Sequence, residues 1–126
     1  MPQPQITGTW DFYGKPEQDG QQGRGQIRLT LTQFGDDITG HLVQVIDPWT
    51  QEPPADPEQT RATVIGRLYV GQAPQATLVE IVRFNEHSDF RAIFVGVLSA
   101  DGQEVTGHIV NSRGNGGSFV MRKDVT

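Results

Sequence analysis

Ile6-Thr7-Gly8-Thr9-Trp10-Asp11-Phe12-Tyr13 is the stretch that decides the predicted fold. Its apolar and polar side chains alternate with a period of two, which is typical of a β-strand with one buried face. The inner face then carries every second residue, namely Ile6, Gly8, Trp10 and Phe12. A β-branched pair followed by glycine returns as Ile38-Thr39-Gly40, Val64-Ile65-Gly66 and Val105-Thr106-Gly107. Inward glycines repeated in this way favour a sheet that bends strongly and closes on itself.

Length and composition limit the class of protein. The chain has 126 residues, which suits a single domain over residues 1–126. Its 15 glycines and 8 prolines, without a long helical periodicity, indicate an all-β protein rich in turns. The formal charge of −5 comes from interspersed acids and bases, so no basic face is offered to nucleic acid. Because cysteine is absent, neither a disulfide framework nor a thiolate site is possible.

The sequence carries no signal for membrane insertion or export. No apolar run is long enough to span a bilayer, so we expect no membrane association. Residues 1–5 have neither the basic nor the apolar region of a signal peptide. We therefore expect a cytoplasmic location, and secretion with a removed signal peptide stays open as an alternative.

Seven further segments alternate like the first one. They span residues 26–33, 38–46, 62–70, 76–84, 90–98, 104–111 and 118–122. The proline-rich segment 47–59 cannot form a ladder strand and is predicted to be a loop. Because each strand is joined to the next by a short or medium loop, the sequence predicts an eight-stranded antiparallel up-and-down β-barrel. A two-sheet sandwich is the alternative architecture.

The predicted loops fall into two sets at opposite ends of the barrel. Those at one end are tight and span residues 34–37, 71–75 and 99–103. Those at the other end are longer or glycine-rich and span residues 14–24, 47–59, 85–89 and 112–116. Long loops gathered at one end are typical of a barrel with a single opening. We call this end the mouth and the opposite end the floor.

Pairing the inward glycines across neighbouring strands predicts which side chains line the barrel. The predicted pairs are Leu31 with Gly40, Gly66 with Glu80, Phe84 with Phe90, and Gly96 with Gly107. In this register the residues expected to bind a ligand are Phe12, Gln44, Trp49, Glu80, Phe84, Phe90, Phe94, Asn111 and Phe119. Most of these side chains are apolar, so the expected ligand is a small, largely apolar molecule.

Glu80 has the strongest chemical interest in this register. An inward carboxylate without a basic neighbour would be desolvated, which suits a general acid or base or a ligand anchor. A slip of one residue would instead place Glu80 in water on the outer face. Arg83 and Arg91 fall opposite each other on the predicted outer face. If the register of these strands is inverted, the two arginines point into the mouth and the ligand is an anion.

The tryptophans and histidines have simpler interpretations. Trp10 is expected to plug the barrel floor, because large buried aromatic residues anchor cores. Trp49 lies in a polar loop, where it either covers the mouth or packs on neighbouring prolines. The histidines at positions 41, 87 and 108 lack the spacing of metal ligands, so we expect no metal site. No phosphate-loop motif is present, and no cofactor is expected.

These features resemble the calycin group of barrels, which includes lipocalins, fatty-acid-binding proteins and avidins. Gly8-Thr9-Trp10 matches their Gly-x-Trp motif on the first strand. Arg122 lies where many of them carry a basic residue near that tryptophan. The resemblance implies a barrel that binds a small molecule. Avidins line their biotin site with several tryptophans, whereas this chain has 2, so biotin binding is not implied.

Three functional hypotheses follow, and fold alone does not choose among them. The first is a small-molecule-binding protein whose ligand lies in the barrel. The second is a cofactor-free enzyme, such as a cyclase or isomerase, that uses Glu80 to move a proton. The third is a structural or inhibitory module that acts through its loops. Binding ranks first, because no second acid or base completes a catalytic set.

The outer face of the later strands predicts self-association. In the chosen register it carries a run of apolar side chains: Ile65, Tyr69, Val79, Ile81, Ile93, Val95, Val97, Val110 and Val120. Soluble monomers rarely expose so large an apolar patch, and the sequence predicts no helix to cover it. We therefore expect a homodimer, or a tetramer built from such dimers as in avidins.

Overall fold

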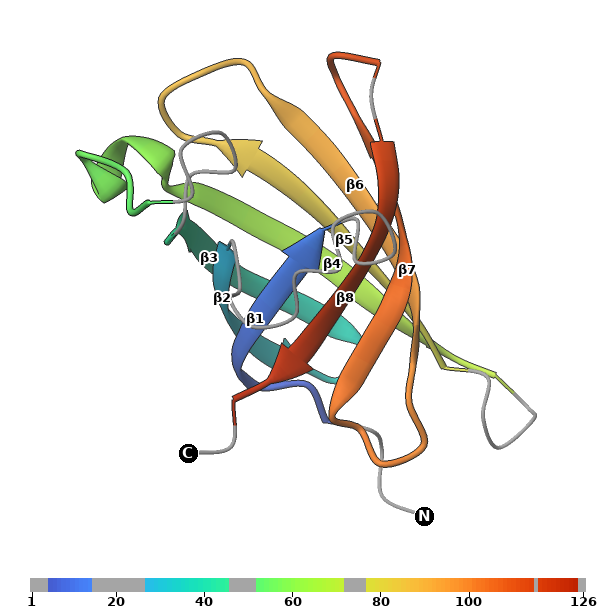
Figure 1. Cartoon of the computed structure of the whole chain (residues 1–126). Coiled ribbons are helices and arrows are strands. Elements are labelled where there is room, and N and C mark those ends of the chain that lie inside the picture. The colour runs from blue at the N-terminus through green and yellow to red at the C-terminus, as the bar shows by residue number, and fades with distance from the viewer. Residues whose placement is uncertain (1–4, 15–26, 46–51, 72–76, 115, 125–126) are drawn as a thin grey trace.

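A computed structural model describes residues 5–14, 27–45, 52–71, 77–114 and 116–124 as a closed barrel of eight antiparallel strands in chain order (Figure 1). The strands are β1 (Gly8–Gly14), β2 (Ile27–Phe34), β3 (Asp37–Gln44), β4 (Ala62–Val70), β5 (Thr77–Asn85), β6 (Arg91–Leu98), β7 (Glu104–Asn111) and β8 (Gly116–Lys123). A single turn of 3₁₀ helix, η1 (Pro57–Thr60), precedes β4. The predicted up-and-down barrel is confirmed, and the sandwich alternative is wrong. No helix in the described part of the chain has the length and apolar character needed to cross a membrane.

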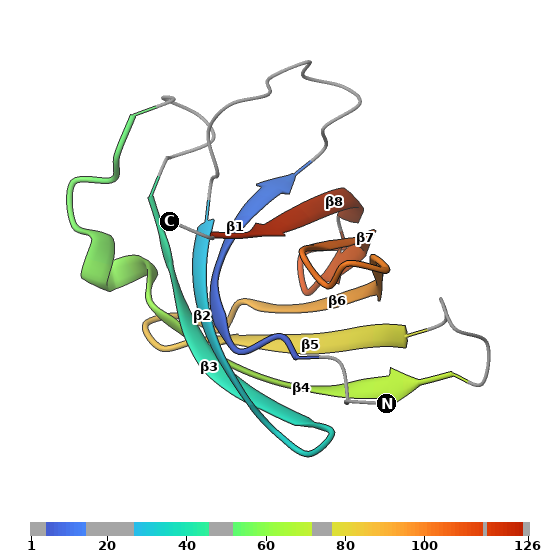
Figure 2. The ribbon, with the colours of Figure 1, turned by 90° about the horizontal axis from the view of Figure 1, so that it is seen from below.

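The barrel closes where its first and last strands meet. β1 pairs antiparallel with β8, and Trp10 faces Lys123 while Phe12 faces Met121. Seen from below, β1 and β8 lie side by side and complete the ring (Figure 2). Hydrogen bonding therefore continues around the whole ring, and the sheet has no free edge.

The register of two hairpins agrees with the sequence prediction. Leu31 faces Gly40 between β2 and β3, and Gly96 faces Gly107 between β6 and β7. In the β2–β3 hairpin the large aliphatic residues share the face of Gly40, so only one register buries them. The β6 strand is apolar on both faces, because Ile93, Val95 and Val97 lie on its outer face.

The predicted register of β5 is wrong by one residue on both sides. Gly66 faces Ile81 instead of Glu80, and Phe84 faces Arg91 instead of Phe90. Because a slip of one residue turns every side chain to the opposite face, the inner face of β5 carries Val79, Ile81 and Arg83. The observed register keeps the Glu80 carboxylate out of the apolar interior, where an unpaired charge is unfavourable.

The inward glycines permit the tight curvature of the sheet. A Cβ atom at Gly40 would lie 2.0 Å from the carbonyl oxygen of Thr30, and one at Gly66 would lie 2.1 Å from that of Glu80. No side chain fits at such a distance from a neighbouring strand. The repeated glycines therefore lie where a neighbouring backbone leaves no room for a Cβ atom, and their inward position agrees with the sequence prediction.

Trp10 closes the floor of the barrel and is fully buried. Its indole Nε1 donates a hydrogen bond of 2.8 Å to the carbonyl oxygen of Ile6. The basic residue beside it is Lys123, whose Nζ lies 5.7 Å from the ring centroid. Arg122, the basic residue to which the family resemblance pointed, instead lies on the outer face, where its Nε is 3.0 Å from Oε2 of Glu104.

Candidate functional site

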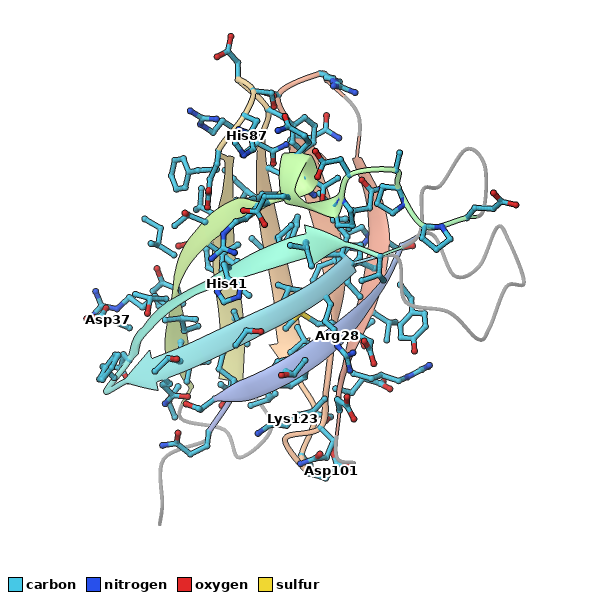
Figure 3. The ribbon with its side chains drawn as sticks, turned by 90° about the vertical axis from the view of Figure 1, so that its left-hand side faces the viewer. Arg28, Asp37, His41, His87, Asp101 and Lys123 are labelled. Carbon is cyan, nitrogen blue, oxygen red and sulfur yellow. The ribbon has the colours of Figure 1, made fainter. Side chains whose placement is uncertain are left out.

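The predicted mouth is the end of the barrel where β5 joins β6 and β7 joins β8. His87 marks the β5–β6 turn at this end, whereas Asp101 and Lys123 lie at the floor (Figure 3). The first residue of β1 and the last residue of β8 also lie toward the floor (Figure 1). The mouth is therefore the end of the barrel at which β1 ends and β8 begins.

Three stacked phenylalanines fill the middle of the barrel. The ring centroid of Phe12 lies 5.3 Å from that of Phe94 and 5.4 Å from that of Phe119. Each of the three side chains is 3% exposed or less. Toward the floor, the described inward side chains of Trp10 and Leu29 are fully buried. The described side chains thus fill the barrel from the floor up to this aromatic trio, and a ligand would lie above it.

Arg83 projects into the barrel above the aromatic trio. It comes from the inner face of β5, where its pairing partners are the small apolar residues Val64 and Ala92. Its Nε donates a hydrogen bond of 2.8 Å to Oδ1 of Asn85, and its guanidinium lies 5.1 Å from the ring centroid of Phe90.

The Arg83 guanidinium has lost part of its hydration. Burial lowers its pKa to about 10, so the side chain is still cationic near neutral pH. Within the described segments of the chain, no carboxylate lies close enough to form an ion pair with it. Among the described residues, the Arg83 guanidinium therefore contacts an amide oxygen and an aromatic ring but no acid.

Two predicted site residues lie next to Arg83. Phe90 is half-buried against the core, and its ring contacts the guanidinium groups of both Arg83 and Arg113, the latter 5.2 Å from the ring centroid. Asn111 ends β7 on the inner face and pairs with Ala92, the same residue that pairs with Arg83. Its Oδ1 accepts a hydrogen bond of 3.0 Å from the backbone N–H of Arg113. We call this group, Arg83, Asn85, Phe90, Asn111 and Arg113, the mouth cluster.

Gln44 lies on another part of the mouth. It ends β3 on the inner face, where it pairs with Ile27, and its backbone N–H donates 2.9 Å to Oγ1 of Thr60 in η1. This bond ties β3 to η1 and holds Gln44 at the mouth. The structure thus places Gln44 at the predicted end of the barrel but does not bring it into the mouth cluster.

Two predicted ligand-facing residues point away from the barrel interior. Oε1 of Glu80 accepts a hydrogen bond of 3.1 Å from the hydroxyl of Tyr69, and both side chains lie on the outer face. Phe84 also lies on the outer face, 5.3 Å from the guanidinium of Arg91. Both corrections follow from the one-residue shift of β5. The cyclase or isomerase hypothesis loses the carboxylate on which it depended.

The outward Glu80 changes the pKa of the neighbouring Tyr69. Its hydrogen bond and its negative charge raise the pKa of the Tyr69 hydroxyl above the ordinary value. Trp49, which the sequence predicted as a ligand-binding residue, lies outside the described residues.

The sequence argument missed Arg83 as an inward residue. Its only signal was the alternative register, in which Arg83 and Arg91 both pointed into the mouth. The structure places Arg83 inside and Arg91 outside, because Arg91 pairs with Phe84 on the outer face.

The described residues offer no candidate metal centre. Among them, no three side chains of histidine, cysteine, aspartate or glutamate gather closely enough to hold an ion. The mouth cluster therefore offers two guanidinium groups, two amides and one aromatic ring, which are groups suited to hydrogen bonding, charge pairing and stacking.

The fold is that of an avidin-type barrel, one of the calycin-like barrels that the Gly-x-Trp strand resembles. Among solved structures, the chain is similar to one named AVR2, with 14% sequence identity, a TM-score of 0.63 and coverage of 95% of each chain. No protein-family model matches the sequence, and no curated protein matches it either. At this identity the likeness establishes the fold alone.

Proposed function

We propose that this protein binds a small molecule at the mouth of its barrel, above the aromatic trio. The observation that carries the proposal is the change in character of the inner face. It is apolar and buried as far as the trio, and above the trio it carries the half-buried side chains of Arg83, Phe90 and Asn111. Concave sites that combine apolar walls with a few convergent polar groups are typical of small-molecule binding.

The character of the lining suggests how such a ligand is held. Phe90 and the partly buried Ile109 pack against the core and offer apolar contact. The amides of Gln44 and Asn111 supply hydrogen-bonding groups that fix orientation. A ligand that is mostly apolar, with one polar end, matches this arrangement.

Two phenylalanines provide a matched test. Phe90 lies at the mouth and Phe84 on the outer face, and each is half-buried beneath an arginine. We expect small molecules to raise the melting temperature of the native protein and of Phe84→Ala, but to lose about tenfold or more in affinity for Phe90→Ala. Affinity is measured by titration calorimetry on hits from a thermal-shift screen.

The possible results separate the hypotheses. Equal losses in both variants would place the binding elsewhere. A screen without any hit, together with an empty extract of the purified protein, would favour a module that acts through its loops.

We also infer that the protein assembles through an apolar wall on the outer face of β4 to β7. Seven of its side chains are between 43% and 66% exposed: Ile65, Tyr69, Leu78, Ile93, Val95, Val97 and Val110. Cross-strand pairing makes this surface continuous, since Tyr69 faces Leu78 and Leu78 faces Val97. The expected outward positions of Val79 and Ile81 are wrong, because both are buried inside the barrel.

A second copy of the chain is the partner that best fits the apolar wall. The row Arg67, Glu80, Val95 and His108 crosses it and places an acid among basic groups. A two-fold axis through this row can set the acid of one copy against a base of the other, while the apolar side chains on both sides become buried. A homodimer, or a tetramer of such dimers, follows.

A further inference from the structure

We propose that the ligand at the mouth carries a carboxylate and that Arg83 binds it. This inference rests on the proposed function, because it names the chemical class of the small molecule bound there. The observation behind it is an inward, half-buried guanidinium without an acidic partner among the described residues.

An inward arginine is energetically unfavourable in the apolar interior of this barrel unless another group offsets its charge. Buried charges are unfavourable unless they are paired, and a hydrophobic residue at position 83 would continue the row of Val79 and Ile81. Asn85 satisfies Nε, and Phe90 covers one face of the guanidinium. Neither partner neutralises the charge. An anionic group on a bound ligand would neutralise the positive charge of Arg83, which the described residues do not.

The geometry around Ala92 suits a carboxylate. Ala92 lies between Arg83 and Asn111 in the ladder, so these two polar side chains come from strands about 10 Å apart. Ala92 itself is buried, so neighbouring side chains cover its small methyl group. An arginine can donate two parallel hydrogen bonds to one carboxylate.

The second arginine of the mouth cluster adds to the positive potential. The Arg113 guanidinium also lies over the Phe90 ring, and it too forms no ion pair within the described part of the chain. Two guanidinium groups over one aromatic ring concentrate positive charge at Phe90, although the neighbouring β5–β6 turn also carries the exposed acids Glu86 and Asp89. The apolar body of the ligand would contact Phe90 while its acid meets Arg83.

The test uses pairs of probes that differ only in charge. Octanoate and octanamide, benzoate and benzamide, and naphthoate and naphthamide are titrated into the full-length protein by calorimetry. We expect each acid that binds to exceed its amide by about tenfold or more. We expect Arg83→Met to abolish this preference, because each acid should lose much more affinity than its amide.

Arg91→Met serves as the matched control. Arg91 is also stacked on a phenylalanine, but it lies on the outer face, so its loss should leave the acid preference intact. The melting temperature of Arg83→Met should stay the same or rise, because the variant removes a desolvated charge without opening a large cavity. A marked fall would show that Arg83 has a structural role and would overturn the inference.

The remaining outcomes are decisive as well. Amides that bind as well as their acids, or an acid preference that survives Arg83→Met, would overturn the carboxylate inference and leave the proposed small-molecule site standing. If no member of any pair binds and the wider thermal-shift screen is also empty, the proposed function itself fails.

Discussion

At the scale of single residues, the exchange of places between Glu80 and Arg83 decides the chemistry of the mouth. With Glu80 inside, the barrel would offer a carboxylate that can move a proton. With Arg83 inside, it offers a fixed cation, which binds and orients but does not act as an acid or base near neutral pH. One step in the register of β5 therefore separates a proposed catalyst from a proposed binding protein.

The outward position of Glu80 predicts a pH effect that can be measured directly. Because Glu80 raises the pKa of Tyr69, Glu80→Gln should shift one of the two tyrosinate transitions of the chain to lower pH. The sign of the effect on stability follows from linkage. Because the pKa of Tyr69 is higher in the folded than in the unfolded chain, Tyr69 stabilises the folded state at pH values below the ordinary tyrosine pKa. That contribution is lost as the pH rises through the raised value.

Tyrosinate absorbance against pH checks this prediction. Glu86→Gln is the control, since Glu86 contacts Thr63 and Arg61 and neither tyrosine. Ligand affinity should be the same in Glu80→Gln and in the native protein. An unchanged titration, or a loss of ligand affinity, would contradict the outward position of Glu80.

At the scale of strands, the glycines of the inner face set the curvature. The Cβ that Gly66→Ala adds would meet the carbonyl oxygen of Glu80 at 2.1 Å, so β4 and β5 must move apart. We expect the free energy of unfolding to fall by about 2 kcal/mol or more, as in other overpacked cores. Urea denaturation followed by tryptophan fluorescence measures it.

Thr39→Ala is the comparison for the glycine variant. Thr39 is exposed on the outer face of β3, next to inward Gly40, and its loss should cost less than about 1 kcal/mol. If Gly66→Ala is no more destabilising than Thr39→Ala, the close approach of β4 and β5 is not the reason why position 66 requires glycine.

The same strands show how far the sequence could determine the fold. The β2–β3 hairpin has one apolar face and one polar face, so its register and the inward position of Gly40 could be predicted. β5 could not be placed, because Leu78, Val82 and Phe84 on one face are as apolar as Val79 and Ile81 on the other. Only the placement of the charges separates the two registers of β5, and the period-two pattern ignores them.

The candidate site was predictable to the same limited degree. Phe90 and Asn111 could be placed at the mouth. The pairing of Ala92 with Asn111 between β6 and β7 was predicted correctly, and Phe90 directly precedes β6. Arg83 could not, because its direction depends on β5. The basic neighbour of Trp10 was a different case: Arg122 was suggested by the family resemblance, whereas alternation along β8 puts Lys123 on the inner face.

At the scale of the whole molecule, the apolar wall predicts the state of assembly. Ile93 and Val95 lie near its centre, each 45% exposed. The double variant Ile93→Lys, Val95→Lys should be a monomer, whereas the native protein should have twice the mass of one chain or a multiple of it. The reason is that two lysines at the centre of a buried interface would be desolvated without partners.

Light scattering over a range of micromolar concentrations measures the mass. Thr30→Lys, Thr32→Lys on the exposed outer face of β2 adds the same charge away from the wall and should stay associated. A monomeric mass for the native protein would remove the homodimer proposal and leave the mouth site unaffected.

The seam between β1 and β8 has a consequence for how the chain folds. These two strands are the most distant in sequence, yet they must pair before the ring is complete. Every other pair of neighbouring strands is consecutive in sequence and can form its hydrogen bonds soon after synthesis. Contacts between distant segments form slowly, so closure of the seam is expected to limit the folding rate. Until β8 leaves the ribosome, β1 keeps an open edge, and the nascent chain is most exposed to aggregation in that interval.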